Sequence, residues 1–157
     1  MKTLVVYYSR TGNTREVAQE IARELNCDLE EIKDTQNRSG IIGWLKSAYQ
    51  ASRDKFTKIK DLEKNPDDYD LVIIGTPVWA FKPAVPVSTF LYEYRDQLKY
   101  VAFFCTLGSS GFESTMDTMS KLCGREPVQT MKITTDEIKE RTGDCKIEPF
   151  VRDVGDL

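Results

Sequence analysis

Residues 4–14 read Leu-Val-Val-Tyr-Tyr-Ser-Arg-Thr-Gly-Asn-Thr and carry the strongest structural signal in the chain. The run from Leu4 to Tyr8 is continuously apolar and rich in β-branched and aromatic residues, which is typical of a strand buried on both faces. From Thr14 to Leu25, apolar residues recur at helical spacing. Asn13 is the predicted N-cap, and Glu16 completes a capping box with it. The sequence therefore predicts a buried strand, a short polar loop and an amphipathic helix.

The same alternation of strand and helix continues along the chain. Further strands are predicted at 28–32, 70–76, 100–106 and 128–134, and helices at 83–97 and 110–124. Ser110 and Glu113 form the predicted capping box of the later helix, and Gly124 ends it. Strands alternating with helices favour βαβ units with right-handed crossovers. We expect an α/β protein in which residues 1–157 form one domain around a five-stranded parallel sheet, with helices on both faces.

Two segments have weaker patterns. Apolar residues between 41 and 56 share one helical face, beside Trp44, and predict an amphipathic helix that either packs on the core or covers a ligand as a flap. The tail 136–157 is charged and contains Gly143 and Pro149. Only Asp136 to Arg141 is predicted to be helical there.

Composition excludes several classes of function. The chain has 157 residues, a net charge of -3 and no histidine. Histidine-based triads and most zinc sites are therefore excluded, we expect no metal site, and a weakly acidic surface disfavours nucleic-acid binding. The four cysteines are scattered without a C-x-x-C pair, which indicates reduced, structural thiols. With no predicted signal segment or membrane span, we expect a cytoplasmic protein.

Three loops should meet at one edge of such a sheet, because ligands bind beyond the carboxyl ends of the strands where the winding direction reverses. They are Ser9-Arg10-Thr11-Gly12-Asn13-Thr14, Thr76-Pro77-Val78-Trp79-Ala80-Phe81-Lys82-Pro83 and Cys105-Thr106-Leu107-Gly108-Ser109-Ser110-Gly111. The first loop has the donors of a phosphate cradle at a helix N-terminus. Composition alone fits an ordinary turn rich in capping residues equally well. Walker A and three-glycine dinucleotide patterns are absent from it.

The first loop resembles the phosphate-binding signature of flavodoxins, which Ser9, Thr11, Gly12 and Thr14 match. The resemblance continues through residues 75–79 and, more loosely, 107–111, and spans about residues 1–134. It implies a flavodoxin-like fold with strand order 2-1-3-4-5, and FMN held without a covalent bond. It also implies the cofactor-binding residues Ser9, Arg10, Thr11, Gly12, Asn13, Thr14, Thr76, Pro77, Val78, Trp79, Ala80, Phe81, Thr106, Leu107, Gly108 and Gly111.

Within that resemblance, residues 9–14 would hold the phosphate, with Arg10 at a variable position. Trp79 is the candidate to stack on the flavin ring, and the alternative is an indole packed into the core. Backbone groups of 106–111 would bond the ring edge, with glycines allowing close approach or positive φ. Cys105 is interpreted as a small buried hydrophobe rather than a redox thiol. No residue of the chain is predicted to be catalytic, because the cofactor carries the chemistry.

These implications lead to an FMN-binding redox protein that passes electrons through its cofactor. Its partners would be redox proteins if it is a carrier. An alternative is an FMN-dependent oxidoreductase that takes hydride from NAD(P)H and reduces a small acceptor such as a quinone. A flavin-free binding or regulatory domain on the same fold is the alternative from another class.

Overall fold

Five parallel strands form the centre of the protein in a computed structural model that describes residues 1–35 and 56–157. The strands are β1 (Thr3–Tyr7), β2 (Asp28–Glu31), β3 (Leu71–Trp79), β5 (Tyr100–Leu107) and β6 (Thr130–Thr134). Their order in the sheet is β2-β1-β3-β5-β6. This confirms the predicted doubly wound sheet and its order 2-1-3-4-5. A two-residue strand, β4 (Lys82–Pro83), pairs antiparallel with the end of β3.

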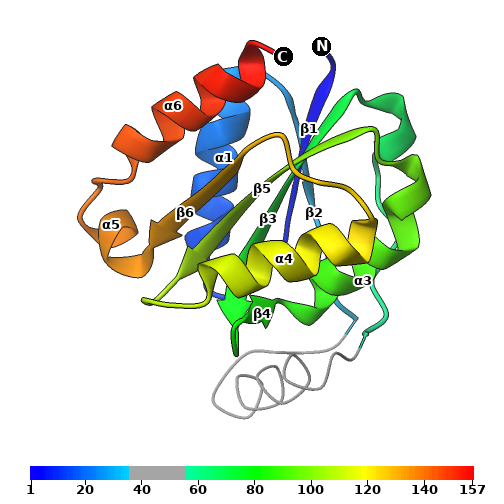
Figure 1. The fold of residues 1–157 in the computed structure, drawn as a ribbon, viewed down its shortest axis with the longest axis horizontal. Helices are drawn as coiled ribbons and strands as arrows, with labels where there is room; N and C mark the ends of the chain where they lie inside the picture. Colours follow the sequence, from blue (N-terminus) through cyan, green and yellow to red (C-terminus); the bar gives the residue numbers. More distant parts are fainter. Residues whose placement is uncertain (36–55) are drawn as a thin grey trace.

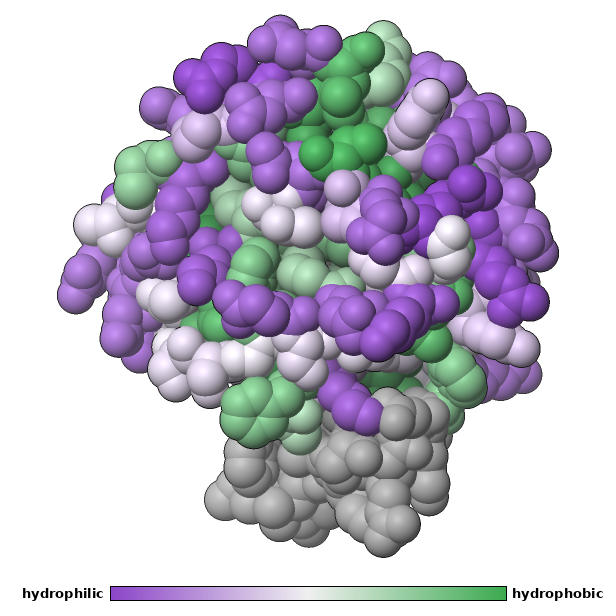
Figure 2. All heavy atoms as spheres, in the orientation of Figure 1, coloured by the Kyte–Doolittle hydropathy of each residue, from purple (hydrophilic) through white to green (hydrophobic). Residues whose placement is uncertain are grey.

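Helices cover both faces of the sheet (Figure 1). Helices α1 (Asn13–Leu25) and α6 (Asp144–Gly155) lie on one face, and α3 (Val85–Tyr94) and α4 (Phe112–Cys123) lie on the other. A short helix, α5 (Thr135–Lys139), follows β6, and 3-10 turns cover Pro66–Asp68 and Arg95–Gln97. Hydrophilic residues cover most of the face seen in Figure 2, and apolar residues show in the hollow at its centre. Within the described ranges, no helix has the length and apolar character to span a membrane.

Burial on both faces explains the continuously apolar strands. In β1, Leu4 and Val6 pack with α3 and α4, whereas Val5 and Tyr7 pack with α1 and α6. Residues 71–74 of β3 and 101–106 of β5 are likewise almost completely shielded from solvent. Each large apolar side chain buried in this way contributes about 1.5–3 kcal/mol relative to exposure. The two cores therefore stabilise the central strands most strongly.

Two predicted helix caps are wrong. The N-cap of α1 is Gly12, at φ 105°, instead of Asn13, and no side chain caps the helix. The N-cap of α4 is Gly111, at φ 103°, instead of Ser110, again without a side-chain cap. In both places the residue before the helix has a left-handed backbone conformation. Glycine adopts this conformation without the steric penalty of a Cβ. The predicted end of α4 is confirmed, because Gly124 closes it at φ 67°.

The second predicted loop is largely a β-hairpin. Val78 pairs with Pro83 and Trp79 pairs with Lys82, so that β3 extends to Trp79 instead of ending at residue 76. Pro83 belongs to the returning strand, and α3 therefore begins only at Val85.

The helix predicted from Asp136 to Arg141 is present as α5, which ends at Lys139, but the prediction of no further helix in the tail is wrong, because α6 is a 12-residue helix. Its charged residues conceal an apolar face of Ile147, Phe150 and Val154, which packs in the core shared with α1. Pro149 lies inside the helix, where it removes one backbone donor without ending the helix. The helix predicted between 41 and 56 falls almost entirely outside the described residues. Its last member, Phe56, is described, and the centroid of its ring lies 5.1 Å from the centroid of the Tyr92 ring.

Gly75 is the position in β3 that tolerates a side chain least. A Cβ built there would lie 2.1 Å from Cζ of Phe104, whose ring is fully buried. We expect Gly75→Ala to lower the free energy of unfolding by about 1–3 kcal/mol, as overpacking of a core does. Urea unfolding followed by far-UV circular dichroism measures this loss.

Gly108→Ala is the matched control, because no atom lies within 4 Å of a Cβ built at Gly108. Its unfolding free energy should stay close to that of the wild type. Adding Phe104→Leu to Gly75→Ala should recover part of the loss, because the smaller side chain makes room for the methyl group. Equal stability of the Gly75→Ala and Gly108→Ala variants would contradict the predicted clash.

Candidate functional site

A cleft of about 250 Å³ lies at the carboxyl edge of the sheet. It forms where β1, β3 and β5, which are neighbours in the sheet, end side by side. All three predicted loops contribute to its walls. The lining residues are Arg10, Thr11, Asn13, Thr14, Pro77, Val78, Trp79, Thr106, Leu107, Gly108 and Thr135.

The first loop leaves its hydrogen-bond donors available to a ligand. Ser9 Oγ accepts the N–H of Gly12 at 3.1 Å, which closes the loop on itself. Gly12, at φ 105°, then turns the chain into α1, and its carbonyl accepts the N–H of Glu16 at 3.0 Å. The first N–H groups of a helix have no partner within the helix. Thr11 and Asn13 also line the cleft, so the first loop offers several neutral donors to it.

A buried hydrogen bond joins the first loop to the third. Thr14 Oγ1 lies 2.7 Å from Thr106 Oγ1, although the two residues are 92 positions apart. Both side chains are almost fully buried and both line the cleft. The start of α1 and the end of β5 are therefore fixed to one another.

Packing holds the β3–β4 hairpin against the third loop. Ala80 and Phe81 form the tip of the hairpin with φ of 48° and 65°, although neither residue is a glycine. A Cβ at Gly111 would lie 2.9 Å from Val78 Cγ1 and 3.1 Å from Phe81 Cα. Gly111 thus allows the close approach expected of a glycine in this loop and has the positive φ as well.

Five predicted site residues besides Gly111 do not line the cleft: Ser9, Gly12, Thr76, Ala80 and Phe81. Ser9 and Gly12 shape the first loop. Thr76 is fully buried; its Oγ1 accepts the Ala84 N–H at 2.9 Å and donates to the Pro77 carbonyl at 2.8 Å. It therefore fixes the hairpin. Ala80 and Phe81 are exposed at the hairpin tip. Whether any of them contacts a ligand stays a prediction.

Trp79 lines the cleft and packs in the core at the same time. Its side chain is 7% exposed, and its ring meets that of Tyr8 edge to face, with 5.5 Å between centroids. Such aromatic pairs are worth about 0.5–1.5 kcal/mol beyond the area they bury. Core packing therefore orients the indole, and its predicted stacking on a flavin stays a prediction.

Thr135 is the lining residue that sequence reasoning missed. It opens α5 directly after β6, and its hydroxyl donates to the Leu107 carbonyl at 3.3 Å. Its position directly after the last predicted strand indicates that it lies near the site, because that strand ends at the same edge of the sheet as the others. The sequence predicts the site only from the loops that follow the first, third and fourth long strands.

The charge of this cleft suits an anion. Arg10 is the cationic lining residue, and no Asp or Glu is among the described residues that line the cleft. A phosphate ester here would meet hydroxyl, amide and backbone donors without a facing carboxylate.

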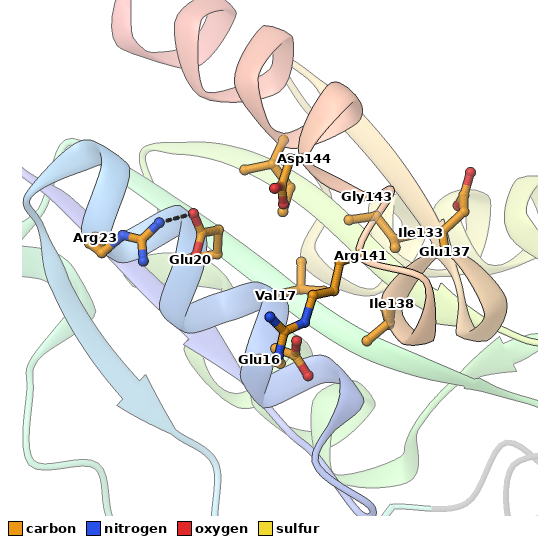
Figure 3. A pocket seen from close by; sticks show the side chains of 11 residues that line it. Glu16, Val17, Glu20, Arg23, Ile133, Glu137, Ile138, Arg141, Gly143 and Asp144 are labelled. Atoms are coloured by element: carbon orange, nitrogen blue, oxygen red, sulfur yellow. Dashed lines mark hydrogen bonds and ion pairs between the residues drawn. The ribbon is translucent and has the colours of Figure 1, made fainter.

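A second cavity, of about 240 Å³, has a different character (Figure 3). It lies between α1 on one side and α5 and α6 on the other, and Glu16, Glu20, Glu137 and Asp144 contribute carboxylates to it. Glu20 is paired with Arg23. Glu137 is paired with Lys146 at 2.6 Å, and hydrogen bonds from Lys146 and Thr134 lower its pKa. Arg23 and Arg141 also line the cavity, but the four carboxylates outnumber these two guanidinium groups, so it suits an anion less than the cleft does.

Cys105 lies behind the cleft and not in its lining. The residue is fully buried in the core, and burial raises the pKa of its thiol to about 12. The interpretation of Cys105 as a buried hydrophobe is confirmed. All four cysteines are free.

Residues 2–145 match the flavodoxin family. The chain belongs to this family. Among solved structures, it is similar to a flavoprotein from Lactobacillus acidophilus in complex with FMN, with 26% identity and a TM-score of 0.74 over 90% of this chain and 98% of that one.

Two further structures resemble it in fold. The two-electron reduced flavodoxin of Megasphaera elsdenii is 19% identical, with a TM-score of 0.62 over 99% of both chains. A protein of known structure from Bacteroides eggerthii is 23% identical, with a TM-score of 0.70 over 92% of this chain and 97% of that one. Comparison with curated proteins gave no match. The flavodoxin-like fold that the resemblance implied is therefore confirmed.

The donor set of the cleft fits FMN. The uncapped start of α1 and the neutral donors of residues 11–14 match a phosphate. Pro77, Val78, Trp79 and Leu107, from the ends of β3 and β5, add apolar side chains to the lining, which suits a planar ring.

Burial predicts which thiol of this protein reacts. Cys145 is exposed, whereas burial raises the pKa of Cys27 to about 11, of Cys105 to about 12 and also that of Cys123. Alkylation acts on the thiolate, which these three residues scarcely form at pH 8. We expect iodoacetamide at pH 8 to add one group quickly, at Cys145, as intact-protein and peptide mass spectrometry would show.

Cys145→Ser is the matched variant and should abolish the fast adduct, while the unfolded wild type should take up four groups. Rapid modification of Cys105 in the folded protein would contradict its burial.

Proposed function

We propose that this protein binds FMN non-covalently in the cleft and transfers electrons through it. The observation that carries the proposal is the convergence of three distant loops on one cleft, whose lining combines neutral donors of the first loop with apolar side chains of β3 and β5. Membership of the flavodoxin family and the FMN complex of the similar Lactobacillus acidophilus flavoprotein support it. Bound FMN would supply the electron-transfer chemistry, and the protein would supply binding, orientation and exclusion of water.

Neutral donors would supply most of the phosphate affinity. A helix dipole alone gives about 0.3–1 kcal/mol at an exposed site. Hydrogen bonds to a charged group contribute roughly 1.5–3 kcal/mol each, so several of them can hold a dianion. Thr11, Asn13 and Thr14 would donate from their side chains, and the first N–H groups of α1 from the backbone. Arg10 would add a cation at the rim.

The apolar walls would hold the ring and keep water from it. Trp79 would stack its indole on the flavin ring, because Tyr8 and the core hold the indole in place. Backbone groups of Thr106 and Leu107 lie at the end of β5, where they could bond the polar edge of the ring. Gly108 would let that edge approach closely, because no side chain fills the space beside it.

In this proposal the protein is an electron carrier whose partners are redox proteins. The basic residues Arg10, in the cleft lining, and Lys82, on the hairpin, favour the second candidate, an NAD(P)H-dependent reductase of a small acceptor. Basic residues beside the cleft would attract the anionic phosphates of NAD(P)H.

The first test is retention of FMN and the role of Thr11 in binding it. The wild type should turn yellow with FMN and stay yellow after desalting. Thr11→Ala should weaken FMN by about 10- to 100-fold, the loss of one hydrogen bond to a charged group. It should change riboflavin affinity by less than about twofold, because riboflavin lacks the phosphate. Fluorescence titration of both flavins measures the dissociation constants.

Thr142→Ala is the control: this exposed threonine lies in the turn before α6 and does not line the cleft. It should bind both flavins as the wild type does. A colourless wild type after saturation with FMN would overturn the proposed function. Equal losses of FMN and riboflavin in Thr11→Ala would contradict a phosphate site at residues 9–14.

Turnover separates the carrier from the reductase. We expect the FMN-loaded protein to oxidise no NADH or NADPH with a quinone unless a separate reductase is added. Absorbance at 340 nm measures the rate. Sustained oxidation of NADH or NADPH without an added reductase would show that the protein is itself the reductase and would contradict the carrier function.

A further inference from the structure

The hydroxyl pair between the two binding loops has an unused proton. Thr14 Oγ1 and Thr106 Oγ1 lie 2.7 Å apart. Each hydroxyl carries one proton, and one of the two occupies the bond between them. Among the described residues, neither hydroxyl has a further hydrogen-bond partner, and both residues line the cleft. The hydroxyl that accepts in this pair therefore keeps its own proton for another acceptor.

The direction of this bond decides which loop receives the remaining proton. If Thr106 donates to Thr14, the Thr14 proton is available beside the open start of α1. If Thr14 donates to Thr106, it is the Thr106 proton that is available, at the end of β5. An ionised phosphate has acceptors only, so it stabilises the first direction. A hydroxyl that already accepts a hydrogen bond is also a stronger donor, because chains of hydrogen bonds polarise one another.

We propose that Thr106 is a positioning residue, which acts through Thr14 to favour flavins that carry a phosphate. The inference rests on the proposed function and deepens it. A residue of the third loop, expected to contact the ring through its backbone, then contributes to phosphate selectivity through its side chain. Thr106 orients the hydroxyl of Thr14 towards the phosphate and makes it a stronger donor.

Thr106→Val tests this role, because valine keeps the shape of threonine and removes the hydroxyl. Without its partner, the Thr14 hydroxyl rotates among three staggered positions and loses its polarisation. We expect FMN affinity to fall roughly 3- to 10-fold, while riboflavin affinity stays within about twofold of the wild type. Thr106→Ser, which retains a hydroxyl, should restore most of the FMN affinity. Fluorescence titration with FMN and with riboflavin gives both constants.

Thr115→Val is the matched control. Thr115 is fully buried in α4, and its hydroxyl has no hydrogen-bond partner in the part of the chain that the structure describes, so removing it should leave both affinities unchanged. Thermal unfolding of each apoprotein establishes that the variants fold. If Thr106→Val does not fold, Thr106→Ala makes the same comparison.

A double-mutant cycle separates action through Thr14 from direct action. In a Thr14→Val background, Thr106→Val should change the ratio of FMN to riboflavin affinity no further, because the residue through which it acts is gone. Equal weakening of both flavins by Thr106→Val, no weakening of either, or additive effects in the cycle would each overturn the inference. Failure of the wild type to bind FMN would overturn the proposed function instead.

Discussion

The parallel pairing of β3 with both β1 and β5 is the constraint on which the cleft depends. Tyr7 pairs with Gly75, and Pro77 pairs with Thr106, so the ends of these strands stand side by side. Parallel strands place their carboxyl ends at one edge, and therefore each following loop starts from the same place. Loops nearly a hundred residues apart in sequence become neighbours without any contact that draws them together. The buried bond between Thr14 and Thr106 then fixes what the sheet has aligned.

Capping differs among the helices that follow β1, β5 and β6 at the carboxyl edge of the sheet. Gly12 and Gly111 begin α1 and α4 without a side-chain cap. By contrast, Thr134 and Glu137 form a full capping box on α5. A capped start satisfies its own N–H groups, whereas an uncapped start leaves them for water or a ligand. The proposed phosphate site, at residues 9–14, includes the uncapped start of α1.

Most of the fold could be predicted, because buried strands and amphipathic helices have strong periodic signals. The failures have local physical causes. Asn13 and Ser110 satisfy capping statistics, but glycine with positive φ replaces both at the site, where local rules are most often broken. The β3–β4 hairpin was missed because Ala80 and Phe81 adopt positive φ without the Gly or Asn typical of such a turn. Helix α6 was missed because Pro149 and charged residues masked its apolar face.

In the proposed site, the charged residue of the lining belongs to the phosphate-binding loop and not to the walls expected beside the flavin ring. Affinity for a phosphate at this site would come mainly from neutral donors, and Arg10, the cation in the lining, belongs to the first loop. The walls expected at the ring, Pro77, Val78, Trp79 and Leu107, carry no charge. A cation beside a flavin would favour its reduced, anionic form, and its influence grows where water is excluded. Because phosphate binding needs no cation at the ring, the residues that retain the cofactor and those that set its potential can change independently.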